Sequence, residues 1–266
     1  HKIATMNIWG TWDGPEIYSG FLRPLEHAET VAEVDAHPWP DPDWFDYERV
    51  GWIWGPQRGL HEWATQNTGY LRVGSAGWQP LFSRLSDLFG MEKALLNMAL
   101  NPKVIEAALD HIVAFLAEHY RRTAEAGRGI YDVLALGDDF ASQRAPLMSP
   151  AMWRRFFKPA WTKLFAIAHE NGMKTSYHSC GAVRPVLGDL VDAGLDILEV
   201  VQISANGMDP HELKQEFGQH LAFYGGMDVQ NFLPNATPEE VRAEARRLIE
   251  VFGRGGRYIF SSTHFL

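Results

Sequence analysis

The residues best suited to chemistry lie in the stretch MKTSYHSCG, at residues 173–181. Cys180 is the single cysteine of the chain, and His178 precedes it by two positions. Side chains two positions apart on a strand point to the same side. The imidazole and the thiol can therefore bind one metal ion together. Alternatively, they pack in the core as a buried cysteine beside a hydrogen-bonded histidine, and the pair alone leaves both interpretations open.

A second histidine, His264, follows the run RYIFSS near the other end of the chain. Because zinc binds both imidazole nitrogen and thiolate sulfur, we expect His178, Cys180 and His264 to hold one zinc ion. Glu199, within LDILEVVQ, would be an exchangeable fourth ligand. Three permanent ligands leave one position open for substrate, as in catalytic zinc sites.

Four carboxylates are candidates for orienting substrate or moving protons, namely Asp138, Asp139, Asp228 and Glu199. Each also has a structural interpretation. Asp138 and Asp139 can cap a helix or pair with Arg144, and Asp228 can cap a helix or fix a loop. Glu199 would be costly in a core without a partner, which favours a function or a cationic neighbour. Candidate substrate contacts are Gln143, Gln202, Tyr177 and Arg184.

Six short runs of apolar, β-branched and aromatic residues would position these side chains. They are typical of buried strands, and they cover residues 70–75, 131–136, 173–178, 195–201, 221–227 and 257–262. Helical patterns lie between them, at 101–127, 149–172, 183–193, 209–217 and 237–253. Ser149 and Thr237 are typical N-caps, each followed by proline, and Pro159 predicts a kink or break.

Alternating strands and helices predict an α/β fold, and their spacing favours a (β/α)8 TIM-type barrel over residues 70–266. No glycine-rich phosphate loop follows the first run, which disfavours a dinucleotide-binding sheet. Two strands must then come from residues 1–69 or be absent. That segment is rich in Trp and Pro, and we expect it to pack on the barrel as loops with a hairpin near IATMNIWGTW. The chain begins in a strand-like run and stops at YIFSSTHFL, so we expect incomplete termini.

The composition narrows the function classes. A net charge of −9 disfavours nucleic acid as a partner, while 46% hydrophobic residues suffice for a buried core. No apolar run reaches the ~18 residues of a membrane span, and the first residues lack the pattern of a secretory signal. A single cysteine excludes an internal disulfide framework. We therefore expect a cytoplasmic protein.

In several stretches the chain resembles the uroporphyrinogen decarboxylase superfamily. The likeness covers roughly residues 70–266 and rests on GDDFASQRAPLMSPAMWRRFFKPAW, YHSCGAVRPVLGDLVDAGLDILEVV, FYGGMDVQNFLPNATPEEV and GGRYIFSSTHFL. In the opening third, HPWPDPDWFDYE resembles bacterial members of the family. The resemblance implies a (β/α)8 barrel.

The superfamily contains decarboxylases and corrinoid-dependent methyltransferases, and this chain resembles the latter. It carries no motif like the arginine-bearing MRQAGR of the decarboxylases. Zinc-dependent methyltransferases of the family bind the metal with His-x-Cys and a later Cys. His178 and Cys180 match the first part, and His264 stands where the later cysteine is expected. The resemblance implies zinc-assisted methyl transfer between a corrinoid, free or on a partner protein, and a thiol or folate, by a chain that pairs as a homodimer.

Three alternatives remain open from the sequence. A metal-free, pterin-dependent methyltransferase would use Asp138, Asp139 and Asp228 around the pterin and would not need Cys180. A decarboxylase would need several arginines at the mouth of the barrel, where the only obvious candidates are Arg184, Arg144 and Arg72. A tetrapyrrole- or corrinoid-protein-binding module would bind its ligand without turnover.

Overall fold

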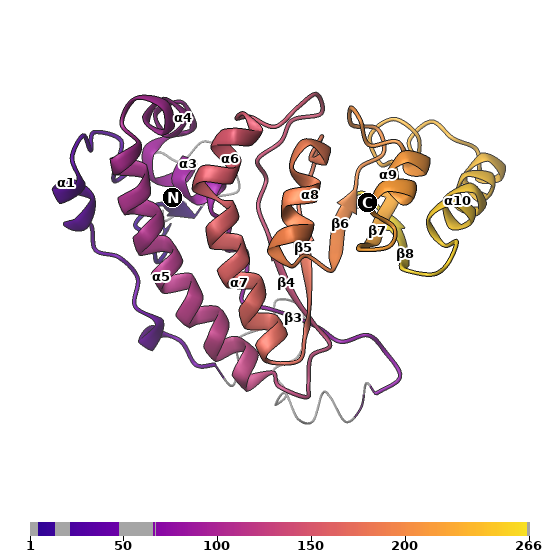
Figure 1. The fold of residues 1–266 in the computed structure, drawn as a ribbon, viewed down its shortest axis with the longest axis horizontal. Coiled ribbons are helices and arrows are strands. Elements are labelled where there is room, and N and C mark those ends of the chain that lie inside the picture. The colour runs from indigo at the N-terminus through magenta and orange to yellow at the C-terminus, as the bar shows by residue number, and fades with distance from the viewer. Residues whose placement is uncertain (1–4, 14–21, 48–65, 67, 265–266) are drawn as a thin grey trace.

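A computed structural model of the chain describes residues 5–13, 22–47, 66 and 68–264 (Figure 1). Its centre is a parallel sheet of six strands that follow one another in chain order, from β3 to β8. The strands are β3 (Val73–Ser75), β4 (Val133–Gly137), β5 (Lys174–His178), β6 (Ile197–Val201), β7 (Ala222–Met227) and β8 (Tyr258–Ser262). All six correspond to predicted runs, so the parallel α/β fold is confirmed.

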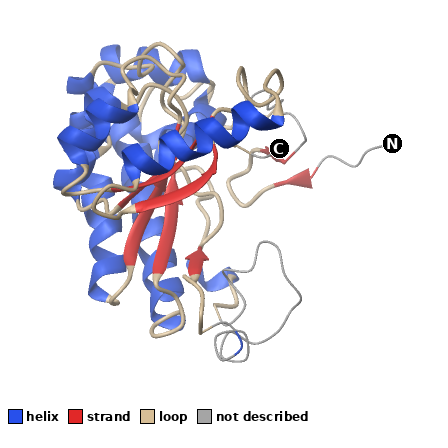
Figure 2. Ribbon diagram, turned by 90° about the vertical axis from the view of Figure 1, so that its right-hand side faces the viewer, coloured by secondary structure: helices blue, strands red, loops and turns tan. Residues whose placement is uncertain are grey.

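Helices connect successive strands and lie mostly on one side of the curved sheet (Figure 2). They are α3 (Phe82–Phe89), α4 (Met91–Leu100), α5 (Pro102–Ala126), α6 (Pro150–Phe156), α7 (Lys158–Glu170), α8 (Arg184–Ala193), α9 (Pro210–Phe217) and α10 (Pro238–Phe252). The sequence analysis predicted no helix over α3 and α4. It correctly predicted the others, including the break before Pro159 that separates α6 from α7.

Local sequence explains where several helices begin. Thr237 accepts a hydrogen bond from the Glu240 backbone, and the Glu240 side chain reaches back to Thr237, which completes a capping box at the start of α10. Ser149 caps α6 through Met152 N. Proline follows each cap because the first turn of a helix needs no backbone N–H there.

The register of the sheet decides which side chains face the helices. Tyr177, Leu198 and Phe223 form one paired row across β5, β6 and β7, and all three are fully buried. Tyr177 packs edge-to-face against Trp161 of α7, with ring centroids 4.8 Å apart. Because side chains alternate along a strand, the neighbouring row that contains His178 faces the opposite, inner side of the sheet.

The described part of the opening segment packs on α5. A hairpin of β1 (Thr5–Met6) and β2 (Trp12–Asp13) confirms the predicted turn, and α1 (Val31–Asp35) and the 3-10 helix η1 (Pro42–Trp44) follow. Trp9 is buried against Phe115 of α5, with ring centroids 5.1 Å apart.

The hairpin forms a separate two-stranded antiparallel sheet. The described residues before 48 therefore add no strand to the six-stranded sheet. We had expected two further strands either to come from residues 1–69 or to be absent, and residues 48–65 lie outside the described ranges. Across the described ranges, no helix is both long and apolar enough to span a bilayer.

Candidate metal centre

The inner row of the sheet brings together residues that are far apart in sequence. Gly137 of β4 pairs with His178 of β5, and His178 pairs with Glu199 of β6. Neighbouring strands lie about 4.8 Å apart, so side chains in such a row meet directly. The carboxyl ends of β4 and β5 then add the residues that follow each strand, Asp139 and Cys180.

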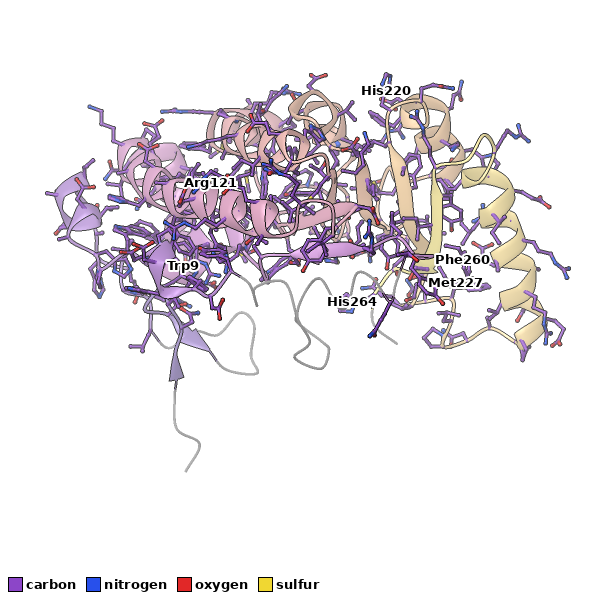
Figure 3. All side chains as sticks on the ribbon, turned by 90° about the horizontal axis from the view of Figure 1, so that it is seen from below. Trp9, Arg121, His220, Met227, Phe260 and His264 are labelled. Carbon is purple, nitrogen blue, oxygen red and sulfur yellow. The ribbon has the colours of Figure 1, made fainter. Side chains whose placement is uncertain are left out.

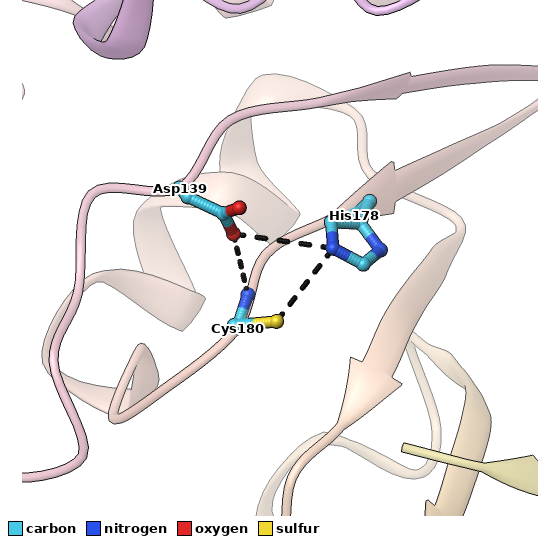
Figure 4. Close-up of side chains that lie close together, drawn as sticks. All are labelled: Asp139, His178 and Cys180. Atoms are coloured by element: carbon cyan, nitrogen blue, oxygen red, sulfur yellow. Dashed lines mark hydrogen bonds and ion pairs between the residues drawn. The ribbon is translucent and has the colours of Figure 1, made fainter. Parts of the chain in front are cut away.

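Asp139, His178 and Cys180 gather at this edge (Figure 4). The Cys180 Sγ lies 3.7 Å from His178 Nε2, and the Asp139 Oδ1 lies 3.9 Å from the same nitrogen. The potential ligand atoms of all three residues lie within 4.8 Å of one another, the one such group of three found in the described part of the chain. All three residues are partly buried, between core and solvent.

These separations fit a tetrahedral metal ion. From zinc–ligand bond lengths, a thiolate sulfur and an imidazole nitrogen on one zinc lie about 3.6 Å apart, and a nitrogen and a carboxylate oxygen about 3.4 Å apart. The sulfur–nitrogen distance of 3.7 Å meets the first value, and the nitrogen–oxygen distance of 3.9 Å requires only a small inward movement. A thiolate, an imidazole and a carboxylate are ligands that zinc accepts, so the residues fit the ion.

Glu199 lies on the other side of the imidazole. Its Oε1 is 3.8 Å from His178 Nδ1, and its Oε2 accepts a hydrogen bond from Ser176 Oγ at 3.0 Å. This arrangement leaves Nε2 facing Cys180 and Asp139. A carboxylate behind a metal-binding histidine fixes the ring and its tautomer. The carboxylate that we expected as an exchangeable ligand is thus positioned to orient His178.

Burial and three polar neighbours have opposite effects on the pKa of His178. Burial favours the neutral ring and lowers its pKa. The Cys180 sulfur, Glu199 and Asp139 together outweigh burial and raise the pKa of His178 to about 10. The surroundings of His178 therefore favour positive charge at this point, which a proton on the ring or a bound metal ion would supply.

The backbone that carries Cys180 is fixed from two sides. The Cys180 N–H donates to Asp139 Oδ1 at 2.9 Å, and the Gly181 N–H donates to Gln202 Oε1 at 2.8 Å. Gly181 has φ +87°, and a Cβ there would lie 2.6 Å from the backbone oxygen of Ser142. Only glycine fits this close, left-handed turn. The loop after β5 that carries Cys180 and Gly181, called the ligand loop below, is therefore held in one conformation.

Gln202 also connects the loops around it. Its Nε2 donates to Gln143 Oε1 at 3.0 Å and to Gln230 Oε1 at 3.2 Å. With Gly181, these bonds tie together the loops that follow β4, β5, β6 and β7. Gln143 and Gln202, both predicted to contact substrate, thus lie side by side next to the metal cluster. Gln230 was not predicted.

Asp138 and Asp139 separate at the end of β4. Asp138 is buried, and its carboxylate accepts hydrogen bonds from the backbone of Leu81, Phe82 and Ser83 at the start of α3. Burial raises the pKa of Asp138 to about 6, although the bonds from Ser83 and Phe82 act in the opposite direction. Asp138 therefore caps α3, as one of the alternatives expected, and Asp139 alone faces the cluster.

Other predicted residues lie outside the cluster. Asp228 accepts hydrogen bonds from Gln230 N and Asn231 N and fixes that turn, near Ser204. Arg184 is held by Glu212 and Glu216 of α9. Tyr177, predicted as a substrate contact, is fully buried and packs on Trp161 of α7, away from the cluster.

His264 is exposed and points outward from the ribbon, near Phe260 and Met227 (Figure 3). It does not belong to the group of ligand atoms within 4.8 Å. Asp139, and not His264, is the third member of this group.

The structure adds one residue to the site that the sequence analysis did not single out. Trp78 follows β3, and its ring lies edge-to-face with His178, with centroids 5.6 Å apart and an angle of 80°. Its position just after the first strand-like run was the available signal, because the same rule located Asp139 and Cys180.

Comparison with known proteins identifies relatives. A model of the family described as Uroporphyrinogen decarboxylase (URO-D) matches residues 82–266. The chain is 27% identical over 165 residues to "Methylcobamide:CoM methyltransferase MtaA" of Methanosarcina barkeri, which covers 62% of this chain and 45% of that protein. It is 25% identical over 238 residues to "Methylated-thiol--coenzyme M methyltransferase" of Methanosarcina mazei, which covers 90% of this chain and 58% of that protein.

A solved structure described as "methyltransferase from Methanosarcina mazei" shares the fold. Its TM-score is 0.57 at 26% identity, over 71% of this chain and 52% of that one. The chain thus spans about half the length of the relatives that it matches. The family model covers well over half of this chain, from α3 to the end of the sheet. The chain belongs to the uroporphyrinogen decarboxylase (URO-D) family.

Proposed function

We propose that this protein is a methyltransferase that moves a methyl group from a corrinoid to a thiol-type acceptor, or to a folate, with zinc held by Asp139, His178 and Cys180. One observation carries the proposal: a thiolate, an imidazole and a carboxylate converge at zinc-like separations at the carboxyl edge of a parallel sheet. The printed names of the relatives, which include methylcobamide and thiol substrates, support the same chemistry.

The ligand set suits a catalytic ion. Three protein ligands leave a fourth position of a tetrahedral zinc for an acceptor. Zinc bound there would supply an acidic position at which the acceptor thiol loses its proton. The thiolate sulfur would form a bond to the methyl carbon as the bond from that carbon to cobalt breaks, and the electron pair of the broken bond would stay with the corrinoid. The proton leaves to solvent.

Residues of the chain prepare this step. Cys180 would act as a ligand rather than as the attacking nucleophile, with its sulfur 3.7 Å from His178 Nε2 and beside Asp139. Glu199 holds the ring of His178 with Nε2 toward the metal. Gln143 and Gln202 present amide groups beside the ligand loop for orienting the acceptor.

The decarboxylase alternative receives less support. It requires arginines at the mouth to bind several carboxylates, and two of the three candidates are engaged elsewhere. Arg184 pairs with Glu212 and Glu216, and Arg72 pairs with Asp132.

We also infer that the six parallel strands belong to a (β/α)8 barrel. Sequential order, parallel pairing and helices on one face of a curved sheet are the features of that fold. Its active sites lie at the carboxyl ends of the strands, where Asp139 and Cys180 are found.

The direct test is methyl transfer from methylcobalamin to 2-mercaptoethanesulfonate, followed by mass spectrometry of the methylated thiol. Zinc-loaded protein should transfer the methyl group, and chelator-treated protein should recover activity only when zinc is returned. His178→Gln should abolish transfer, whereas His211→Gln, at an exposed histidine of α9, should not. Full activity without metal would favour the pterin-dependent alternative, and zinc-loaded protein without transfer would contradict the proposal.

A further inference from the structure

Trp78 presents a half-exposed aromatic ring directly beside the metal cluster. Its side chain is 46% exposed, although its ring edge lies against the imidazole of His178 at 5.6 Å between centroids. Burying a tryptophan against an apolar partner is favourable, so an exposed ring at a substrate site is a candidate contact surface.

The loop that carries Trp78 is held in place at both ends. Ala76 O accepts a hydrogen bond from the buried His119 Nε2 at 3.1 Å, and Gly77 N donates to Ser75 Oγ at 3.1 Å. After the tryptophan, Asp138 binds the backbone of Leu81 and Phe82. The ring is therefore presented by a fixed loop, which reduces the entropy cost of binding a ligand on it.

Space for the ring is provided by Gly137. A Cβ at this position would lie 2.8 Å from Trp78 Cζ3 and 2.8 Å from His178 Cβ. The absence of a side chain on β4 lets the indole lie on the inner face of the sheet, next to the ligand histidine. The indole thus lies next to His178 and remains partly exposed to solvent.

The chemistry of this surface differs from that of its surroundings. The neighbouring loops offer amides from Gln143 and Gln202, which suit a small polar acceptor. An indole face instead packs on flat, conjugated or apolar rings. We propose that Trp78 packs against the corrin macrocycle of the methyl donor, which rests on the methyltransferase function proposed above.

The test measures binding of methylcobalamin by calorimetry, with zinc-loaded protein and no thiol present, so that no turnover occurs. Trp78→Ala should raise Kd about tenfold, in the range of ring stacking, and Trp78→Phe should raise it no more than about threefold. Trp44→Ala is the matched control, because Trp44 is 62% exposed on η1 and belongs to the opening segment. Kinetics should then show a higher KM for methylcobalamin with an unchanged KM for the thiol.

Each outcome decides the question. Wild-type protein that binds no methylcobalamin contradicts the corrinoid function itself, and the inference with it. If the wild type binds methylcobalamin and Trp78→Ala binds it with the same Kd, the proposed contact of Trp78 with the corrin is wrong, while the proposed corrinoid function is not contradicted. A raised KM for the thiol instead would assign Trp78 to the acceptor. Loss of zinc in both Trp78 variants, measured by metal analysis, would make Trp78 a support of His178 and overturn the substrate contact.

Discussion

At the scale of single residues, the site depends on which of two adjacent carboxylates faces His178 and Cys180. Asp139 turns toward His178 and Cys180, and Asp138 turns into the core to cap α3. The sequence predicted His178 and Cys180 as a pair because alternation along a strand is a local property. It could not choose between Asp138 and Asp139, because the strand ends there and the loop geometry decides.

Two other residues show what a local sequence pattern can and cannot predict. Tyr177 lies between His178 and Ser176, so alternation alone could have assigned it to the helix-facing side, where it packs against Trp161. Arg184 pairs with Glu212, 28 positions away, and such long-range pairing is not visible in a local pattern.

Glu199 should strengthen metal binding without being a ligand. Glu199→Gln removes the charge facing His178 Nδ1 and should weaken zinc binding about tenfold to hundredfold, while about one zinc per chain still binds at saturation. Competition with a chromogenic chelator measures this affinity. Glu212→Gln, at a carboxylate paired with Arg184, is the control and should bind zinc as the wild type does. Unchanged affinity in Glu199→Gln would show that the carboxylate does not support the ring.

At the scale of elements, strands and helices were predictable because their signals are local. The six runs are short, apolar and bounded by caps such as Ser149 and Thr237. Helices α3 and α4 were missed. The start of α3 is capped by Asp138, 56 positions from Phe82, so no capping residue marks it locally.

The Asp138 cap should contribute strongly to stability. Asp138→Ala leaves three backbone N–H groups at the start of α3 without their acceptor inside the protein, and should lower the free energy of unfolding by about 2–4 kcal/mol. Urea denaturation measures the change. Thr237→Ala removes an exposed cap and should cost about 1 kcal/mol. Equal costs for both variants would contradict the capping role of Asp138.

The ligand loop should tolerate no side chain at Gly181. Gly181→Ala places a Cβ 2.6 Å from Ser142 O, so the loop must move and zinc affinity should fall at least tenfold. Gly172→Ala has a similar φ of +77° but meets no atom within 4 Å, and should cost only about 1 kcal/mol of stability with no change in zinc affinity. Zinc titration and thermal unfolding of the two variants separate these effects. A Gly181→Ala protein with wild-type zinc affinity would show that the loop geometry is unimportant.

At the scale of the whole molecule, the opening segment and the sheet share one hydrophobic core. Trp9, Leu25 and Val34 belong to the same buried cluster as the helices around the sheet. The opening segment also reaches the site, because Tyr47 contacts His119, which binds the loop before Trp78. The boundary near residue 69 and the homodimer stay predictions.

The central claim is that the folded chain holds one metal ion through Asp139, His178 and Cys180. Metal analysis by inductively coupled plasma mass spectrometry, on protein saturated with zinc and then desalted, tests it most directly. We predict about one zinc per chain for the wild type and for His264→Ala, and a loss of most zinc in Cys180→Ser and Asp139→Ala. Zinc that survives in Asp139→Ala but is lost in His264→Ala, or a wild type that retains none, would contradict this account.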